Sequence, residues 1–359
     1  MKKILIISNM FPSKKYKHYG VFVENTAKIL KQNGYKVTVS ALKKKDTKIT
    51  KLLGYSWFYL KAILTALFGH YDYLYAHYIS HCALLIKIIK KIKPDIKVII
   101  NVHGNDVVPE NEHDEKFIPM VKEVLPMIDM CITPSKYFQD IMISQYHLSK
   151  DIVRVFPSGG VDQRVFKHFD HSKTLFDLDE KKTVIGYVGR YEIRKGWEIF
   201  LKAVNLLEHR DQYQFVMVGT GDEEHQADQM IEKYNLNIKK LHMLNQKDLA
   251  KLYSAIDIFC FPTYRKSESL GLVGLEAMAC GAITIASNMA GPTSYIVDKE
   301  NGFFFEPCNP EDLKKKIEYV LQLSQSEKEE IKNNAYQTVK QYDINQISGI
   351  LIDIFESID

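Results

Sequence analysis

Residues 261–287 have the sequence Phe261-Pro-Thr-Tyr-Arg-Lys-Ser-Glu268-Ser-Leu-Gly271-Leu-Val-Gly-Leu-Glu276-Ala-Met-Ala-Cys-Gly281-Ala-Ile-Thr-Ile-Ala-Ser287. An apolar run that ends at Pro262 predicts one strand, and the run from Ala282 predicts another. Between them we expect a helix that begins near Gly271 and ends before Gly281, a residue suited to a helix end. A strand, a helix and a second strand in this order predict a parallel sheet with a crossover helix.

The same alternation of short β-branched runs and longer amphipathic patterns continues along the chain. The predicted strands cover residues 3–7, 36–40, 98–101, 130–133, 184–189, 214–219, 258–262 and 282–286. Further helical patterns cover residues 21–33, 197–208 and 246–255. Such alternation predicts parallel sheets with crossover helices, so the expected fold class is α/β.

The length of the chain, 359 residues, favours two domains of about 150 to 200 residues each. The predicted junction is the polar stretch at residues 154–182. We expect one doubly wound, Rossmann-like domain over residues 1–165 and a second over residues 166–335. A C-terminal helix, residues 336–359, is expected to cross back onto the first domain. Because open α/β sheets bind ligands at the carboxyl ends of their strands, the expected site is a cleft between the two domains.

The formal net charge of +4 hides an uneven distribution. Residues 1–150 contain 23 Lys, no Arg and 12 acidic residues, so they carry +11 and the remainder carries −7. A basic half indicates an anionic partner. Lysine without arginine argues against nucleic acid, because Arg supplies the bidentate contacts to phosphates and bases.

Cysteine usage and the N-terminus both favour a cytoplasmic location. The five cysteines are widely spaced and form no Cys-x-x-Cys pair, which is typical of a reduced compartment. The chain begins with Met1-Lys-Lys, but the apolar run that follows has only four residues and leads to no cleavage site. We therefore interpret it as a first strand and not as a signal peptide.

Two carboxylates and one helix terminus are the first candidates for a functional site. Glu268 precedes the predicted helix, and Glu276 lies eight positions later, inside it. The first turn of that helix offers backbone N–H groups and the positive end of the helix dipole to an anion. The alternative is an ordinary helix with an acidic start and a face of small residues for close packing.

This segment resembles the Glu-x7-Glu region of the retaining, nucleotide-sugar-dependent glycosyltransferases of family 4 (glycosyltransferase group 1), of bacterial surface-polysaccharide type. That family has the GT-B fold, in which two Rossmann-like domains face each other across a cleft. Ser269 and Leu270 stand where the family has Gly and Phe. The resemblance implies that Glu268 contacts hydroxyls of the donor sugar and Glu276 contacts the ribose. It also implies that the backbone amides around Leu270, Gly271 and Leu272 bind the diphosphate.

The resemblance extends to three further elements of the second half. Arg190 and Lys195 lie on a loop that leaves a strand, where two cations can clamp a pyrophosphate and offset its growing charge, or can form a mere surface pair. In Val218-Gly219-Thr-Gly-Asp, Gly219 would allow the backbone to approach a ligand. Met243 lies before the predicted helix 246–255, where family members hold the base through backbone groups.

In the first half, the resemblance implies roles for His103 and Gly20. His103 lies in Asn101-Val-His-Gly-Asn-Asp106, which resembles the family's His-Gly-x-Asp loop, whose His faces the donor sugar. His77 resembles another recurrent family position, and we interpret it as a structural residue of the cleft. Asp106 is expected to cap or orient the loop. Gly20 belongs to the loop 8–24, which resembles the one that the family places over donor and acceptor, and which could also be a plain strand-to-helix loop.

No metal or other cofactor is expected. Asp177-Leu-Asp179 has an Asp-x-Asp pattern, but it lies in the predicted junction and not at the end of a strand. His168-Phe-Asp-His171 is a short polar run without further ligands at suitable spacing.

A membrane contact is expected through residues 43–68. Five lysines from Lys43 to Lys51 lead into a 17-residue stretch with a single charge, Lys61. The aromatic residues from Trp57 to Tyr59 are of the kind enriched at membrane interfaces. Peripheral contact with an anionic leaflet is the favoured interpretation, and an ordinary buried helix is the alternative.

The sequence therefore predicts a metal-independent, retaining glycosyltransferase at the inner face of the bacterial plasma membrane. It would transfer a sugar from a nucleotide-sugar, UDP-linked, to a hydroxyl of a growing lipid-linked surface glycan, such as capsule, exopolysaccharide, O-antigen or teichoic acid. His103, Arg190, Lys195 and Glu268 would be its catalytic residues. A sugar-nucleotide epimerase of similar build and a non-catalytic glycan-binding subunit are the alternatives.

Overall fold

The computed structural model describes residues 1–17 and 19–358, which form two compact units. Unit 1 comprises Met1–Gly159 and the C-terminal residues from Ile347 on, and unit 2 comprises Gly160–Gln346. Residues 160–165, expected in the first domain, belong to unit 2, because Val161 forms a bridge with Asp343.

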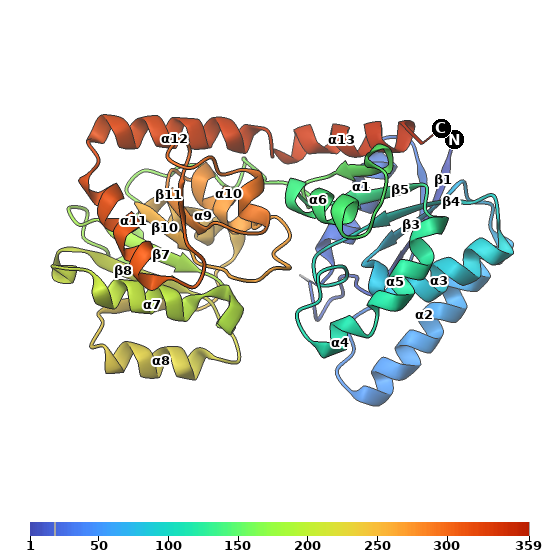
Figure 1. The fold of residues 1–359 in the computed structure, drawn as a ribbon, viewed down its shortest axis with the longest axis horizontal. Helices are drawn as coiled ribbons and strands as arrows, with labels where there is room; N and C mark the ends of the chain where they lie inside the picture. The colour runs from blue at the N-terminus through green and yellow to red at the C-terminus, as the bar shows by residue number, and fades with distance from the viewer. Residues whose placement is uncertain (18, 359) are drawn as a thin grey trace. The chain divides into compact units, whose positions relative to one another are not determined.

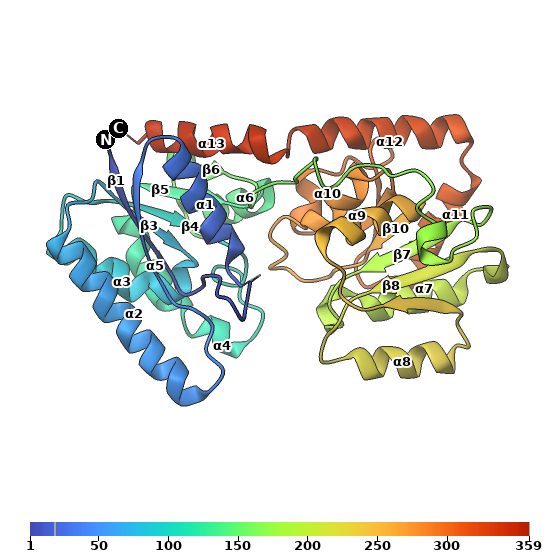
Figure 2. The same ribbon diagram turned by 180° about the vertical axis from the view of Figure 1, so that it is seen from behind.

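Unit 1 is a six-stranded parallel sheet covered by helices on both faces (Figures 1 and 2). The strand order is β2-β1-β3-β4-β5-β6. The strands are β1 (Lys3–Ser8), β2 (Lys36–Ala41), β3 (Tyr73–His77), β4 (Lys97–Asn101), β5 (Met130–Thr133) and β6 (Val153–Val155). The helices are α1 (Val21–Gln32), α2 (Lys48–Phe68), α3 (Ile79–Ile92), α4 (Glu112–Glu115), α5 (Ile118–Val124), α6 (Lys136–Ser144) and α13 (Ile344–Glu356), whose first residues belong to unit 2.

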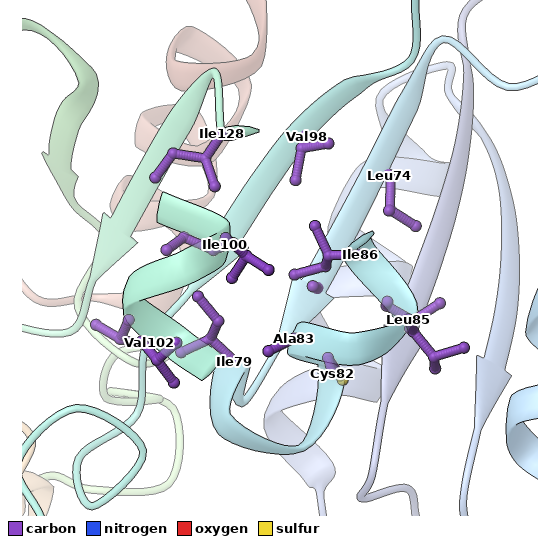
Figure 3. Close-up of a cluster of buried hydrophobic side chains, with 14 of the residues drawn as sticks. Leu74, Ile79, Cys82, Ala83, Leu85, Ile86, Val98, Ile100, Val102 and Ile128 are labelled. Atoms are coloured by element: carbon purple, nitrogen blue, oxygen red, sulfur yellow. The ribbon is translucent and has the colours of Figure 1, made fainter. Parts of the chain in front are cut away.

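Each face of this sheet has its own apolar core. On one face, α2, α3 and α5 pack against the strands; Figure 3 shows Ile86 of α3 beside Leu74 of β3 and Val98 of β4. On the other face, α1 and α13 pack against the same strands. Because both faces are covered, a central strand such as β3 is buried along its whole length.

Unit 2 repeats this architecture with its own six-stranded parallel sheet, in the order β12-β11-β10-β7-β8-β9. The strands are β7 (Val184–Val188), β8 (Gln214–Val218), β9 (Ile238–Leu241), β10 (Ile258–Phe261), β11 (Ile283–Ser287) and β12 (Phe303–Phe305). The helices are α7 (Trp197–Leu206), α8 (Glu224–Lys233), α9 (Gln246–Ala255), α10 (Leu272–Ala279), α11 (Pro310–Gln322) and α12 (Gln325–Lys340). Two cores again flank the sheet, one with α9, α10 and α12 and the other with α7 and α11.

The C-terminal segment contains two helices and not one. Residues 341–343 separate α12 from α13. α12 buries Ala335 and Val339 in the core of unit 2, whereas α13 buries Leu351 and Phe355 in unit 1. The end of the chain therefore belongs to unit 1 from Ile347 on, and not from residue 336 as expected, because α12 packs on unit 2.

α2 is a continuous helix of 21 residues that is buried on one side only. It packs against α3, beside which it lies in both views (Figures 1 and 2). No helix in the described part of the chain is long and apolar enough to cross a membrane.

Candidate active site

The candidate residues of unit 2 follow the carboxyl ends of neighbouring strands. Strands β7 and β10 are directly paired and parallel, so the loops that follow them meet at the same edge of the sheet. The loop after β7 carries Arg190 and Lys195, and the loop after β10 carries Glu268. This is the edge at which open α/β sheets bind their ligands.

Lys195 and Glu268 form a nearly buried ion pair. Lys195 Nζ lies 2.6 Å from Glu268 Oε2, and the two side chains are 16% and 12% exposed. Thr263 Oγ1 lies 3.2 Å from the same carboxylate oxygen. The structure thus brings together two predicted residues that are 73 positions apart in sequence.

The electrostatic balance at this pair favours the charged carboxylate. Burial alone would raise the pKa of Glu268, but the charge and hydrogen bond of Lys195 outweigh burial, with help from Arg265 and Thr263. The pKa of Glu268 is therefore lower than its usual value. A charged carboxylate accepts hydrogen bonds from hydroxyl groups, and Lys195 supplies a cation beside it.

Close backbone contacts fix the two loops to each other. The Tyr264 N–H donates to the carbonyl of Arg194 over 3.0 Å. Gly196 adopts a left-handed conformation (φ 77°), and a Cβ there would lie 1.9 Å from the carbonyl oxygen of Pro262. Only glycine fits, so Lys195 is held in position by the residue that follows it.

The first turn of α10 lies directly after the loop of Glu268. Its N-cap, Gly271, has φ 80° and supplies no side-chain acceptor to the amides of that turn. A Cβ at Gly271 would lie 2.6 Å from the ring of Phe261. The carbonyl of Gly271 accepts a hydrogen bond of 3.0 Å from Tyr295 Oη. The geometry leaves backbone N–H groups and the positive end of the helix dipole available to an anion.

Glu276 is the second carboxylate of this region and lies in the second turn of α10. Within residues 1–17 and 19–358 its side chain has no hydrogen-bond or ion-pair partner. Burial raises the pKa of Glu276 to about 7. A partly buried carboxylate without a partner is suited to accept hydrogen bonds from the hydroxyls of a ligand.

Arg190 has a different environment from Lys195. Its guanidinium pairs with Glu192 over 2.9 Å, and the two side chains are 59% and 40% exposed. The structure thus pairs the two predicted cations with different carboxylates, one pair at the surface and one nearly buried.

Gly219 and Met243 occupy the loops after β8 and β9. A Cβ at Gly219 would lie 1.9 Å from the carbonyl oxygen of Gly189, so this glycine allows the loops after β7 and β8 to meet. Met243 is 67% exposed. Asn245 caps α9, because its side chain accepts hydrogen bonds from the amides of Lys247 and Asp248. Leu270 is buried, and Leu272 is partly exposed.

In unit 1, His77 and His103 are brought together at the carboxyl ends of the paired strands β3 and β4. His77 Nδ1 lies 3.0 Å from His103 Nε2, so one of the two rings donates to the other. Burial lowers the pKa of His103 to about 3, and it lowers that of His77 as well, helped by His103. Both rings are therefore neutral near pH 7. The ring of Phe22 lies 4.2 Å from that of His103.

Asp106 holds the loop of His103 in place. Its carboxylate accepts hydrogen bonds from the backbone N–H groups of His103, Gly104 and Ile79, at 2.9, 2.9 and 3.1 Å. Burial raises the pKa of Asp106 to about 6, although these amides oppose the shift. Asp106 thus caps the loop, as the sequence predicts.

Gly20 is the N-cap of α1 and has a left-handed conformation (φ 76°). A Cβ there would lie 2.7 Å from the backbone of Met10. This glycine therefore allows the start of α1 to lie against the backbone of Met10. His18, in the same loop, lies outside the described residues.

Thr263 has a role in the site that the sequence did not indicate. Thr263 is fully buried and contacts Glu268, but a lone Thr after a strand carries no recognisable signal. The contact of His77 with His103 depends on the pairing of β3 with β4, and β3 was not among the predicted strands. No cluster of metal-ligating side chains is present among the residues that the structure describes.

Comparison with known proteins identifies the family. Residues 170–338 match the family model "Glycosyl transferases group 1", and residues 19–163 match "Glycosyltransferase Family 4". The chain belongs to the group 1 glycosyltransferases. Its curated relatives include an uncharacterized glycosyltransferase of Methanocaldococcus jannaschii, 26% identical over 65% of this chain and 62% of that protein. They also include a D-inositol 3-phosphate glycosyltransferase of Corynebacterium jeikeium, 26% identical over 53% of this chain. The chain spans about half of the latter's length, 48%.

Solved structures of similar fold confirm the expected GT-B architecture. Sucrose-phosphate synthase from Thermosynechococcus elongatus superimposes with a TM-score of 0.82 at 18% identity, over 99% of this chain and 98% of the other. Anabaena Alr3699/HepE in complex with UDP gives a TM-score of 0.81 at 18% identity, over 99% and 100% of the two chains. That protein has also been solved with UDP-glucose.

Proposed function

We propose that this protein transfers a sugar from a nucleotide-sugar, UDP-linked, to a hydroxyl of a growing lipid-linked surface glycan, with retention at the anomeric carbon. The observation that carries the proposal is the ion pair of Lys195 and Glu268 beside the N-terminus of α10. Complexes of the structurally similar Alr3699/HepE with UDP and UDP-glucose support the donor class.

Each group of the site has a place in this reaction. Lys195 and Arg190 stabilise the charge that grows on the leaving diphosphate, and the free amides at the start of α10 add to this stabilisation. Glu276 accepts hydrogen bonds from the ribose hydroxyls. Glu268 and His103 orient the donor sugar. No step requires a metal, because Lys195, Arg190 and the α10 amides supply the positive charge that the diphosphate needs.

Retention follows from front-face attack. The carboxylate of Glu268 is already committed to Lys195 at 2.6 Å, so it is a poor candidate for a covalent nucleophile. The leaving phosphate itself then accepts the proton of the attacking hydroxyl. Trapping a glycosyl-enzyme intermediate by mass spectrometry would contradict this route.

A lipid-linked acceptor implies a working position at the cytoplasmic face of the plasma membrane. The excess of lysine in residues 1–150 agrees with an anionic surface there. The expected contact through residues 43–68 is part of this proposal.

The decisive experiment is the Lys195→Ala variant, assayed with a panel of nucleotide-sugars and an extract of lipid-linked glycans. We expect transfer to fall about 100- to 1,000-fold, as when a preorganised charge is removed from a developing anion. Lys173→Ala is the matched control, because the side chain of Lys173 is also 16% exposed and is paired with Asp257 over 2.8 Å. If Lys195→Ala kept its rate within about twofold, the assignment would be wrong.

Omission of the acceptor separates transfer from epimerisation. A transferase consumes donor only slowly without acceptor, whereas an epimerase converts it to an isomer. Chromatography of the nucleotide-sugar after incubation distinguishes the two.

A further inference from the structure

The outer side of α2 is an exposed apolar surface. Phe58, Ala62 and Ala66 face the core of unit 1. Away from this buried side the helix carries eight large apolar side chains, which are between 41% and 80% exposed. They are Ile49, Leu52, Leu53, Trp57, Leu60, Leu64, Leu67 and Phe68. We call this set the outer face of α2.

The outer face forms one stripe along the whole helix. Its members recur at intervals of three and four residues, for example Leu53, Trp57, Leu60 and Leu64, which places them on one side of a helix. Twenty-one residues correspond to a length of about 31 Å. Continuous apolar surface of this extent is unusual for a protein face in water, and it marks a contact with a partner or a membrane.

Positive charge lies beside this stripe. Residues 43–68 contain six lysines and a single acidic residue, Asp46. Asp46 is already paired with Lys15 over 2.7 Å. Lys43, Lys45 and Lys61 line a pocket of about 470 Å³. We call it the lysine pocket.

The lysine pocket and the outer face share residues. Leu53 and Trp57 belong to the stripe and also line the pocket. An apolar surface that borders directly on a cluster of cations matches the lipid bilayer, whose acyl chains lie just beneath its phosphate groups.

We infer that the outer face of α2 docks on an anionic lipid bilayer, with α2 parallel to the membrane plane and a lipid phosphate in the lysine pocket. Trp57 then lies at the depth where aromatic side chains are favoured. A second copy of this chain fits less well, because residues 43–68 would offer it the same six lysines and a single carboxylate, Asp46, which is already paired with Lys15. This inference rests on the membrane contact of the proposed function and deepens it, because it assigns the side of α2 that meets the bilayer and the chemical group that the lysine pocket binds.

The charge requirement is tested by co-sedimentation of the full chain with vesicles. Wild-type protein should bind vesicles that contain phosphatidylglycerol and should bind pure phosphatidylcholine much less. The Lys43→Glu, Lys45→Glu double variant should lose at least tenfold in partition coefficient. Lys28→Glu with Lys31→Glu on α1 is the control, since it makes the same change in net charge at exposed positions elsewhere in unit 1. Equal loss in both double variants, or no binding by the wild type, would overturn the inference.

The apolar requirement has a built-in spectroscopic probe. Trp57 is 65% exposed, whereas Trp197, the other of the two tryptophans, is only 3% exposed. A blue shift of emission on addition of anionic vesicles therefore reports Trp57 entering an apolar environment, and it should vanish in Trp57→Phe.

Two exposed leucines test the stripe itself. Leu53→Ser with Leu60→Ser should weaken vesicle binding about tenfold, whereas Leu175→Ser with Val297→Ser, at similarly exposed positions of unit 2, should not. Unchanged vesicle binding in the Leu53→Ser, Leu60→Ser variant would contradict the inference. So would light scattering that shows a wild-type dimer and a monomeric variant. Stabilisation by UDP, measured on every variant, should stay unchanged, so that failure of membrane docking and failure of the donor site are told apart.

Discussion

At the scale of single residues, burial separates two similar ion pairs. Lys195 with Glu268 and Arg190 with Glu192 both join a cation to a carboxylate at less than 3 Å. An exposed pair contributes little, because water screens it. A nearly buried pair is costly to break, since either partner left alone is an unpaired buried charge. Lys195 is therefore positioned firmly, whereas Arg190 can turn toward a ligand at little cost.

Glu276→Gln should stabilise the protein at alkaline pH. Because burial raises the pKa of Glu276 to about 7, the folded state holds this proton over a pH range in which the unfolded chain, with a pKa of about 4.3, has lost it. The free energy of unfolding therefore falls as pH rises from about 4.3 to 7. Gln cannot ionise, so the variant should gain stability at pH 8 and none at pH 4. Because the carboxylate is partly exposed and water screens it, we expect a gain on the order of 2 kcal/mol, less than the full shift implies.

Urea unfolding of both proteins at the two pH values measures this difference. A gain in unfolding free energy of equal size at pH 4 would show that the stabilisation comes from packing and not from ionisation. UDP should also stabilise Glu276→Gln less than the wild type, because the variant offers the ribose no carboxylate.

His103→Ala should slow sugar transfer about 100-fold and leave UDP binding intact. The neutral ring, held at 3.0 Å from His77, would contact the sugar that is transferred. UDP lacks that sugar, so its binding should not depend on His103. Because the pKa of His103 is lowered to about 3, the rate should show no histidine inflection between pH 5 and 8. His70→Ala, at an exposed position, is the control. Weaker stabilisation by UDP in His103→Ala would contradict this role.

At the scale of elements, the start of α10 depends on glycine. The left-handed Gly271 allows the chain to turn from the loop of Glu268 into the helix, and any larger residue meets the ring of Phe261. The same turn exposes the amides that the diphosphate is proposed to bind. Helix geometry and ligand binding are thus coupled at one position.

Gly271→Ala should cost about 2 kcal/mol of stability and most of the affinity for UDP. The added Cβ would suffer both a left-handed backbone and a contact of 2.6 Å. Gly349→Ala in α13 is the matched control, because nothing lies within 4 Å of a Cβ there. Gly349→Ala should stabilise the protein by about 0.5 to 1 kcal/mol. Thermal unfolding with and without UDP checks both, and equal UDP affinity in Gly271→Ala and wild type would contradict the role of the α10 terminus.

At the scale of the whole molecule, the last helix belongs to the first domain. Ile347, Leu351 and Phe355 of α13 are fully buried in the core of unit 1. The ring centroid of Phe355 lies 5.5 Å from that of Tyr73 and 5.3 Å from that of Tyr75, both in β3, and both pairs meet edge to face. The stability of β3 therefore depends on residues more than 250 positions away.

Leu351→Ala should destabilise unit 1 by about 2 to 5 kcal/mol, the usual range for a fully buried leucine. In calorimetry, the transition of unit 1 should move to lower temperature while the transition that UDP stabilises stays in place. Ile350→Ala, at a position that is 36% exposed, should change little. A shift of the UDP-stabilised transition alone would mean that α13 supports unit 2 instead.

Much of the architecture follows from local sequence. β1, α1, β7, α9 and the segment β10-α10-β11 begin and end within a few residues of the predicted bounds, because apolar period, glycine and proline act locally. β3, β6, β9 and β12 were not predicted. β6 and β12 have only three residues each, and β9 is an edge strand that carries Lys239 and Lys240, so their hydrophobic patterns are weak.

The sequence by itself determined the α/β class, the family and the identity of most candidate residues, because these depend on residue types at short spacings. Only the tertiary structure decided which of them meet. The pairing of β7 with β10 brings Lys195 to Glu268, and the pairing of β3 with β4 brings His77 to His103. It also decided that α2 is buried on one side and exposed on the other. The physical reason is that burial and strand pairing join residues far apart in sequence, and no local pattern records the partner.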